Sequence, residues 1–61
     1  MCESNIILEH DGTRELVMEE VVQVLIDGDK IQLFGILGER KEVKGVIKEI
    51  NLNRHEVIIS N

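Results

Sequence analysis

Regularly spaced turn-forming residues are the feature that most narrowly limits the folds open to this chain. Turn signals occur at Asp11-Gly12, Asp27-Gly28-Asp29, Gly38 and Leu52-Asn53-Arg54. Most of the pieces between them have the length of a β-strand. The hydrophobic residues are mainly Ile, Val and Leu, with Phe34 as the one aromatic residue and no proline in the chain. This composition favours an ordered β-rich domain over a disordered chain.

The first strand is expected over Cys2–His10, with Ile6 and Leu8 on one face. Asp11-Gly12 then predicts a tight hairpin, because glycine tolerates a positive φ. The next stretch, residues 13–24, is ambiguous. Two patterns can be traced in it, a helical stripe of Val17, Val21 and Val24 and a strand alternation of Val22, Val24 and Ile26. Its β-branched residues favour the strand, with a short turn expected at Met18-Glu19-Glu20.

A hairpin is predicted around Asp27-Gly28-Asp29, between the strands Val21–Ile26 and Lys30–Leu37. In this hairpin Val22, Val24 and Ile26 would face Ile31 and Leu33. Apolar residues remain on the other face as well. We therefore expect a barrel interior to cover one face and a partner subunit to cover the other.

Residues 39–51 also permit a helix, but Gly45 argues against it. A glycine inside a helix costs about 1 kcal/mol relative to alanine, whereas a glycine inside a strand marks a bend or bulge. The last strand is expected over His55–Ser60. Five or six short strands of this kind predict an all-β fold, a small SH3-like barrel of Greek-key type, in a single domain over residues 1–61.

Size and charge limit the partners. A chain of 61 residues buries only about 60% of its unfolded surface, and one cysteine permits no internal disulfide, so we expect a homodimer. The net charge of −5 makes nucleic acid an improbable partner. No apolar run approaches the roughly 18 residues of a membrane span, and no signal segment opens the chain. A reducing, cytoplasmic location is expected.

Cys2 is the one residue with distinctive chemistry. If Met1 is removed, its thiolate and the freed α-amine form a five-membered chelate, a donor set that suits Ni(II) or Cu(II). One chain supplies too few ligands, but two Cys2 residues at a symmetric dimer axis could complete a site. His10 and His55 are more simply turn or hydrogen-bonding residues. The carboxylates suggest no catalytic pair, because so short a chain can hardly enclose a cleft. We therefore predict no enzyme.

The whole chain resembles the CooT family of very short proteins that begin Met-Cys. The likeness lies in Met1-Cys2-Glu3, in the spacing of Gly12, Gly28, Gly38 and Gly45, in the Val-rich segment with Met18 and Val22, and in His55-Glu56-Val57-Ile58-Ile59. The resemblance implies an SH3-like β-barrel, a homodimer, and one Ni(II) held through the N-terminal cysteine of each subunit. It also implies nickel buffering or delivery to a client metalloenzyme such as carbon monoxide dehydrogenase. Only Cys2 carries over as a metal ligand.

Two other functions compete with nickel binding. One is a metal-independent module whose barrel face docks a larger enzyme, as the excess of apolar strand faces suggests. The other is RNA binding, a label carried by some CooT relatives. The negative net charge and the single aromatic residue argue against RNA binding, because proteins that stack RNA bases use several aromatic side chains.

Overall fold

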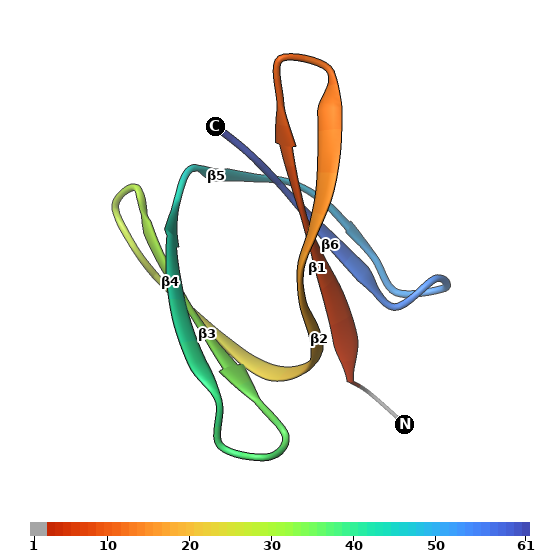
Figure 1. Cartoon of the computed structure of the whole chain (residues 1–61), viewed down its shortest axis with the longest axis vertical. Coiled ribbons are helices and arrows are strands. Elements are labelled where there is room, and N and C mark those ends of the chain that lie inside the picture. Colours follow the sequence, from red (N-terminus) through yellow and green to blue (C-terminus); the bar gives the residue numbers. More distant parts are fainter. Residues whose placement is uncertain (1–2) are drawn as a thin grey trace.

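The computed structural model describes residues 3–61, which form six β-strands and no helix (Figure 1). The strands are β1 (Ser4–His10), β2 (Thr13–Asp27), β3 (Lys30–Gly35), β4 (Arg40–Lys44), β5 (Val46–Asn51) and β6 (Glu56–Ser60). The predicted all-β class is therefore confirmed. The expected strands at both ends of the chain and the predicted turn after residue 51 are present.

The strands form one sheet in the order β4-β3-β2-β1-β6-β5, antiparallel except for the parallel pair β1 and β6. β4 and β5 follow each other in the chain but lie at opposite edges of this sheet. The sheet must therefore curl, and in Figure 1 β5 runs from β4 across to the side of β6, below the β1–β2 hairpin at the top of the view. Within residues 3–61 the two edge strands do not pair, so the sheet is not closed into the hydrogen-bonded barrel that we expected.

Gly45 is the corner that brings the two edges together. Its N–H donates to the carbonyl of Asp29, at 2.9 Å, in the β2–β3 turn. A Cβ at this position would lie 2.6 Å from the carbonyl oxygen of Ser60 and 2.8 Å from Cγ2 of Ile59, both on β6. Only a residue without a side chain permits this approach, which confirms the bend predicted for Gly45.

β2 is a single bent strand of 15 residues, which corrects the turn expected at Met18-Glu19-Glu20. Its first half pairs with β1 and its second half with β3. Glu20 has a φ of +55°, and the ladder to β3 skips Val22. A bulge bends a strand without ending it. β2 therefore continues through Met18-Glu19-Glu20, where the sequence suggested a turn. Val22 is consequently exposed, while Val24 faces Leu33 and Ile26 faces Ile31 as predicted.

The core lies on the inner face of the curl. Its buried members are Ile6, Val21, Ile31, Leu33, Val57 and Ile59, with Leu8, Val17, Met18, Val24, Val43 and Ile47 packed against them. Ile58 is also buried but alternates onto the outer face, where it lies beside Ile7.

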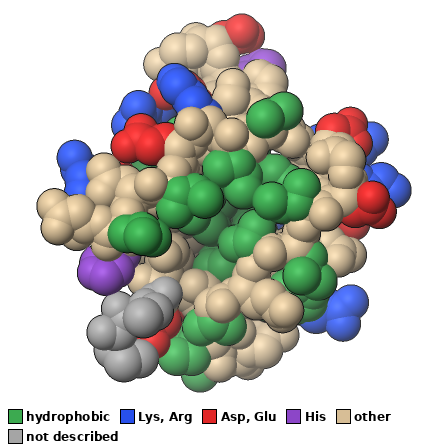
Figure 2. Space-filling model, turned by 180° about the vertical axis from the view of Figure 1, so that it is seen from behind, with side chains coloured by type: hydrophobic (Ala, Val, Ile, Leu, Met, Phe, Trp, Pro, Cys, Tyr) green, Lys and Arg blue, Asp and Glu red, His purple; other side chains and the backbone are tan. Residues whose placement is uncertain are grey.

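The inner face is not completely covered. Ile26 and Ile50 lie opposite the core residues Ile31 and Val57 in the ladders, yet they are 60% and 58% exposed. Figure 2 shows hydrophobic side chains gathered in a hollow at the middle of the rear view, with charged side chains around its rim. The single chain therefore leaves apolar surface of the curl open to solvent.

Candidate metal site at the start of β1

Cys2, the predicted metal ligand, lies outside the described residues, which begin at Glu3. In the sequence only Glu3 lies between Cys2 and Ser4, the first residue of β1. The described part of the chain contains no group of three or more His, Cys, Asp or Glu side chains that could hold a metal ion. Residues 3–61 alone therefore do not form a complete metal site.

The start of β1 is held by both of its neighbours in the sheet. Ser4 pairs with Val21 just after the bend of β2, and Asn5 pairs with Glu56 at the start of β6. The N–H of Asn5 also donates to the carbonyl of His55 at 2.8 Å. This end of β1 is therefore fixed on both sides by backbone hydrogen bonds.

His55 lies in the β5–β6 turn beside the start of β1, exposed and with a φ of +56°. Its prediction as a turn residue is confirmed. Because its carbonyl bonds to Asn5, His55 lies at the same end of β1 as the segment that leads to Cys2.

His10 lies at the other end of β1, about 20 Å along the strand from Ser4 at roughly 3.3 Å per residue. Its Nδ1 is 2.7 Å from the Oδ1 of Asn61, and its Nε2 is 3.2 Å from the Oδ2 of Asp11. His10 thus connects the last residue of the chain to the β1–β2 hairpin. Both ring nitrogens already have partners, which fits a hydrogen-bonding role rather than metal ligation.

The remaining acidic candidates are solvated or structural. Glu19 and Glu20 are exposed on β2. Glu39 accepts a hydrogen bond from the N–H of Leu37 at 3.1 Å and so stabilises the β3–β4 turn. Gly28 has a φ of +62°, as the predicted turn at Asp27-Gly28-Asp29 allows.

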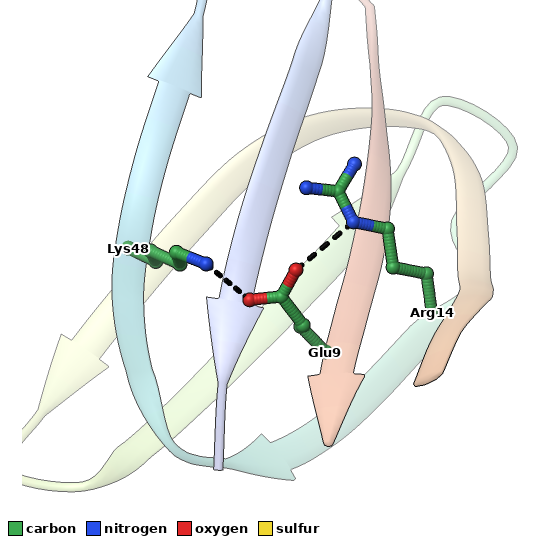
Figure 3. A network of polar contacts seen from close by, with 3 residues as sticks. All are labelled: Glu9, Arg14 and Lys48. Carbon is green, nitrogen blue, oxygen red and sulfur yellow. Dashed lines mark hydrogen bonds and ion pairs between the residues drawn. The ribbon is translucent and has the colours of Figure 1, made fainter. Parts of the chain in front are cut away.

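The main ionic network in the described residues joins Glu9 on β1 with Arg14 on β2 and Lys48 on β5 (Figure 3). The Nε of Arg14 lies 2.9 Å from one carboxylate oxygen of Glu9, and Lys48 donates to the other. The side chain of Glu9 is only 18% exposed. The Lys48 ammonium and the Arg14 guanidinium hold the pKa of the Glu9 carboxyl below its usual range. The network joins three strands and holds no free metal-binding group.

The sequence analysis did not predict this network, although one of its two ion pairs, that of Glu9 with Arg14, follows from the predicted hairpin. A two-residue hairpin at Asp11-Gly12 places Glu9 opposite Arg14, as observed. Lys48 could not be found in this way, because it is the residue that the ladder skips between Ile47 and Glu49.

The match to a family model decides the family. The model described as "CO dehydrogenase accessory protein CooT" matches residues 1–60, nearly the whole chain and including Cys2. The chain belongs to the CooT family. The family resemblance stated from the sequence is thereby confirmed, as is the prediction that the chain is not an enzyme, because a CooT protein is accessory to a catalyst.

Similar proteins support the same assignment. An uncharacterised protein of Methanocaldococcus jannaschii is 42% identical over 59 residues, covering 97% of this chain and 96% of its own length. An uncharacterised protein of Archaeoglobus fulgidus is 38% identical over 42 residues, covering 69% of this chain and 93% of its own. A crystal structure of a protein assigned to CooT from Carboxydothermus hydrogenoformans superposes with a TM-score of 0.90 at 27% identity, covering 98% of this chain and 97% of that one.

In residues 3–61 there is no helix long and apolar enough to cross a membrane.

Proposed function

We propose that this CooT protein is a homodimer that binds Ni(II) through Cys2 of each chain and buffers nickel or delivers it to carbon monoxide dehydrogenase. The observation that carries this proposal is the family match, which starts at residue 1 and therefore includes Cys2. Thiolate ligands suit a borderline-soft divalent ion, and nitrogen donors such as the α-amine freed by removal of Met1 would favour Ni(II). A free thiol of this kind also suits a reducing cytoplasm.

The proposed dimer is supported by the exposed apolar surface of the curled sheet. Ile26 and Ile50 belong to the inner face but stay more than half exposed. A second copy that packs on this face would bury them, and a two-fold interface would use the same patch of both chains. Two Cys2 residues could then supply a ligand set that one chain lacks.

Delivery rather than storage is the mechanism that this site favours. A metal held by two chain ends can exchange its ligands with an acceptor, whereas a site enclosed by the fold would hold its metal. A thiol must lose its proton to bind, so Ni(II) affinity should fall as the pH is lowered. A flat pH profile would contradict thiolate ligation.

The proposal is tested by titrating untagged, reduced protein with Ni(II). The thiolate-to-metal absorption band gives the stoichiometry, and light scattering gives the mass. We expect one metal per two chains and loss of the band in Cys2→Ser. In contrast, His55→Asn should keep the band, since asparagine tolerates the positive φ at that position. If Cys2→Ser binds Ni(II) as tightly as the unchanged protein, Cys2 is not the ligand.

A further inference from the structure

The lysine and arginine side chains fall into two groups. Arg14, Lys48 and Arg54 each form an ion pair with a glutamate. The other four belong to the hairpin of β3 and β4, namely Lys30, Arg40, Lys41 and Lys44. Within residues 3–61, no carboxylate lies at ion-pairing distance from any of these four. Residues 30–44 hold only two carboxylates and so carry a net charge of +2 in a chain of −5. Of these four residues, Lys30, Arg40 and Lys44 lie on the outer face of the hairpin, whereas Lys41 lies on the inner face, where its Nζ donates to the carbonyl oxygen of Val17 at 3.3 Å. The outer face of the hairpin therefore carries three cations on an acidic protein.

β4 also forms one edge of the sheet, and in the described part of the chain it pairs only with β3. Two backbone hydrogen bonds at the ends of the β3–β4 ladder show which residues of β4 bond to β3. The N–H of Gly35 donates to the carbonyl oxygen of Glu39 at 2.8 Å, and the N–H of Gly45 donates to that of Asp29 at 2.9 Å. Hydrogen-bonded pairs alternate along an antiparallel ladder. Lys41 and Val43 therefore bond towards β3.

The alternate residues Arg40, Glu42 and Lys44 consequently direct their N–H and C=O groups to the free edge of β4. Their side chains share the outer face of the sheet, where they lie opposite Phe34, Gln32 and Lys30, respectively. The Arg40 guanidinium lies over the Phe34 ring, 5.8 Å from its centroid. The free edge thus presents backbone donors and acceptors beside a row of charges in the order plus, minus, plus.

Two shallow hollows adjoin this edge on the outer face. One is lined by Phe34 and Arg40, the other by Leu25 and Lys30, and both include Gln32 and Glu42. The first hollow thus combines apolar surface with the cation of Arg40, and the second combines it with the cation of Lys30 and the carboxylate of Asp27. When a peptide adds to a sheet edge as a further strand, pockets that receive its alternate side chains make the binding specific.

We propose that the free edge of β4 binds an extended acidic segment of a partner protein, which pairs with it as an additional strand. Two carboxylates, each two positions from a central uncharged polar residue, would face Arg40 and Lys44, with the polar residue facing Glu42. Opposite charges on directly paired positions stabilise a sheet. This interaction does not depend on nickel, and its test is independent of Cys2.

A second copy of this chain is a poor occupant of the same edge. Antiparallel pairing of two β4 strands about Glu42 places Arg40 opposite Lys44 and Glu42 opposite Glu42. In-register parallel pairing likewise sets each charge against its equal. Like charges at paired positions are destabilising, and natural sheets use such edges to prevent self-association. Nucleic acid is also disfavoured, because Glu42 interrupts the cations that a continuous phosphate backbone needs.

The test uses the full-length chain labelled with nitrogen-15 and a capped synthetic peptide Thr-Glu-Val-Gln-Val-Glu-Val-Thr. We expect peptide binding to slow hydrogen exchange at the amides of Arg40, Glu42 and Lys44. The amides of Lys41 and Val43, already bonded to β3, should change little. Unchanged exchange at the three edge amides would overturn the proposal, even if the peptide associates by charge alone.

Variants at Glu42 separate edge pairing from simple charge attraction. Glu42→Pro removes an N–H that points away from β3, so the native ladder is retained while the free edge loses a donor. Edge pairing predicts that Glu42→Pro loses at least tenfold in peptide affinity, whereas Glu42→Gln binds as well as the unchanged chain or better. Charge attraction alone predicts tighter binding by both. Equal affinity of the two variants would therefore overturn the proposal.

A matched pair of charge variants keeps the test decisive if Glu42→Pro does not fold. Arg40→Gln should weaken peptide binding about threefold, the effect of one cross-strand ion pair. Arg54→Gln removes the same charge from the β5–β6 turn and should have no effect. Equal losses in both variants, or displacement of the peptide by a ten-residue oligouridine, would contradict an acidic strand as the occupant.

Discussion

Lys48 on β5 reaches across β6 to donate a hydrogen bond to Glu9 on β1, a residue 39 positions earlier in the chain. Lys48 can do so because the ladder between β5 and β6 skips it, at a bulge between Ile47 and Glu49. The bulge thus places the ammonium group on the outer face, above the one parallel pair of strands in the sheet. Arg14 holds the carboxylate from the other side.

Replacing Lys48 by methionine should make the stability of the protein less dependent on pH in the acidic range. The pKa of Glu9 is lower in the folded chain than in the unfolded chain. Its ion pairs therefore stabilise the fold above the unfolded pKa of about 4.3, and this contribution is lost as the pH falls through the folded pKa.

Urea unfolding of Lys48→Met and of the unchanged protein at neutral and acidic pH measures this effect. The two midpoints should differ at pH 7 and converge in acid. Glu19→Gln, an exposed carboxylate on β2, serves as the control and should show no such convergence. A constant difference at all pH values would mean that Lys48 acts through packing and not through Glu9.

Gly45→Ala should be the most damaging of the glycine substitutions at the turns. The added methyl group meets the backbone oxygen of Ser60 at 2.6 Å, and backbone cannot yield as the end of a long side chain can. We expect a loss of about 1–3 kcal/mol in the free energy of unfolding, as for overpacked cores. Gly28→Asn is the control, because its Cβ meets nothing within 4 Å and asparagine tolerates the φ of +62°. Equal losses in the two variants would contradict a steric role for Gly45.

Leu33→Ala should cost about 2–5 kcal/mol, because Leu33 is completely buried in the inner core. In a chain of this size that loss approaches the whole free energy of unfolding. Leu37→Ala removes the same atoms from a side chain that is 84% exposed and should be nearly neutral. Thermal unfolding followed by circular dichroism compares the two variants. A mild effect of Leu33→Ala would indicate that the described core is not the stabilising one.

The sequence was sufficient for the features that depend on local chemistry. Asp11-Gly12 forms the expected hairpin, since both residues have the positive φ that such a turn requires. Gly45 bends the chain as predicted. The pairing of Val24 with Leu33 follows from simple alternation once the turn is fixed.

The sequence could not predict the features that depend on distant strands. The bulge at Val22 and the positive φ of Glu20 bend β2 between two different partners, and no local residue pattern marks this bend. The parallel pairing of β1 with β6 joins the two ends of the chain.

Ile50→Lys should dissociate the proposed dimer without unfolding the chain. Ile50 faces the interior of the curl beside Val57, but it is 58% exposed in the single chain. A lysine there costs little in a monomer, whereas an unpaired charge buried between two copies is strongly unfavourable. Leu52→Lys, at a position 78% exposed in the β5–β6 turn, introduces the same charge away from the inner face and is the control. Light scattering should give the mass of one chain for Ile50→Lys and of two chains for Leu52→Lys. If both variants keep the mass of two chains, the dimer uses another surface, and the apolar curl is not its interface.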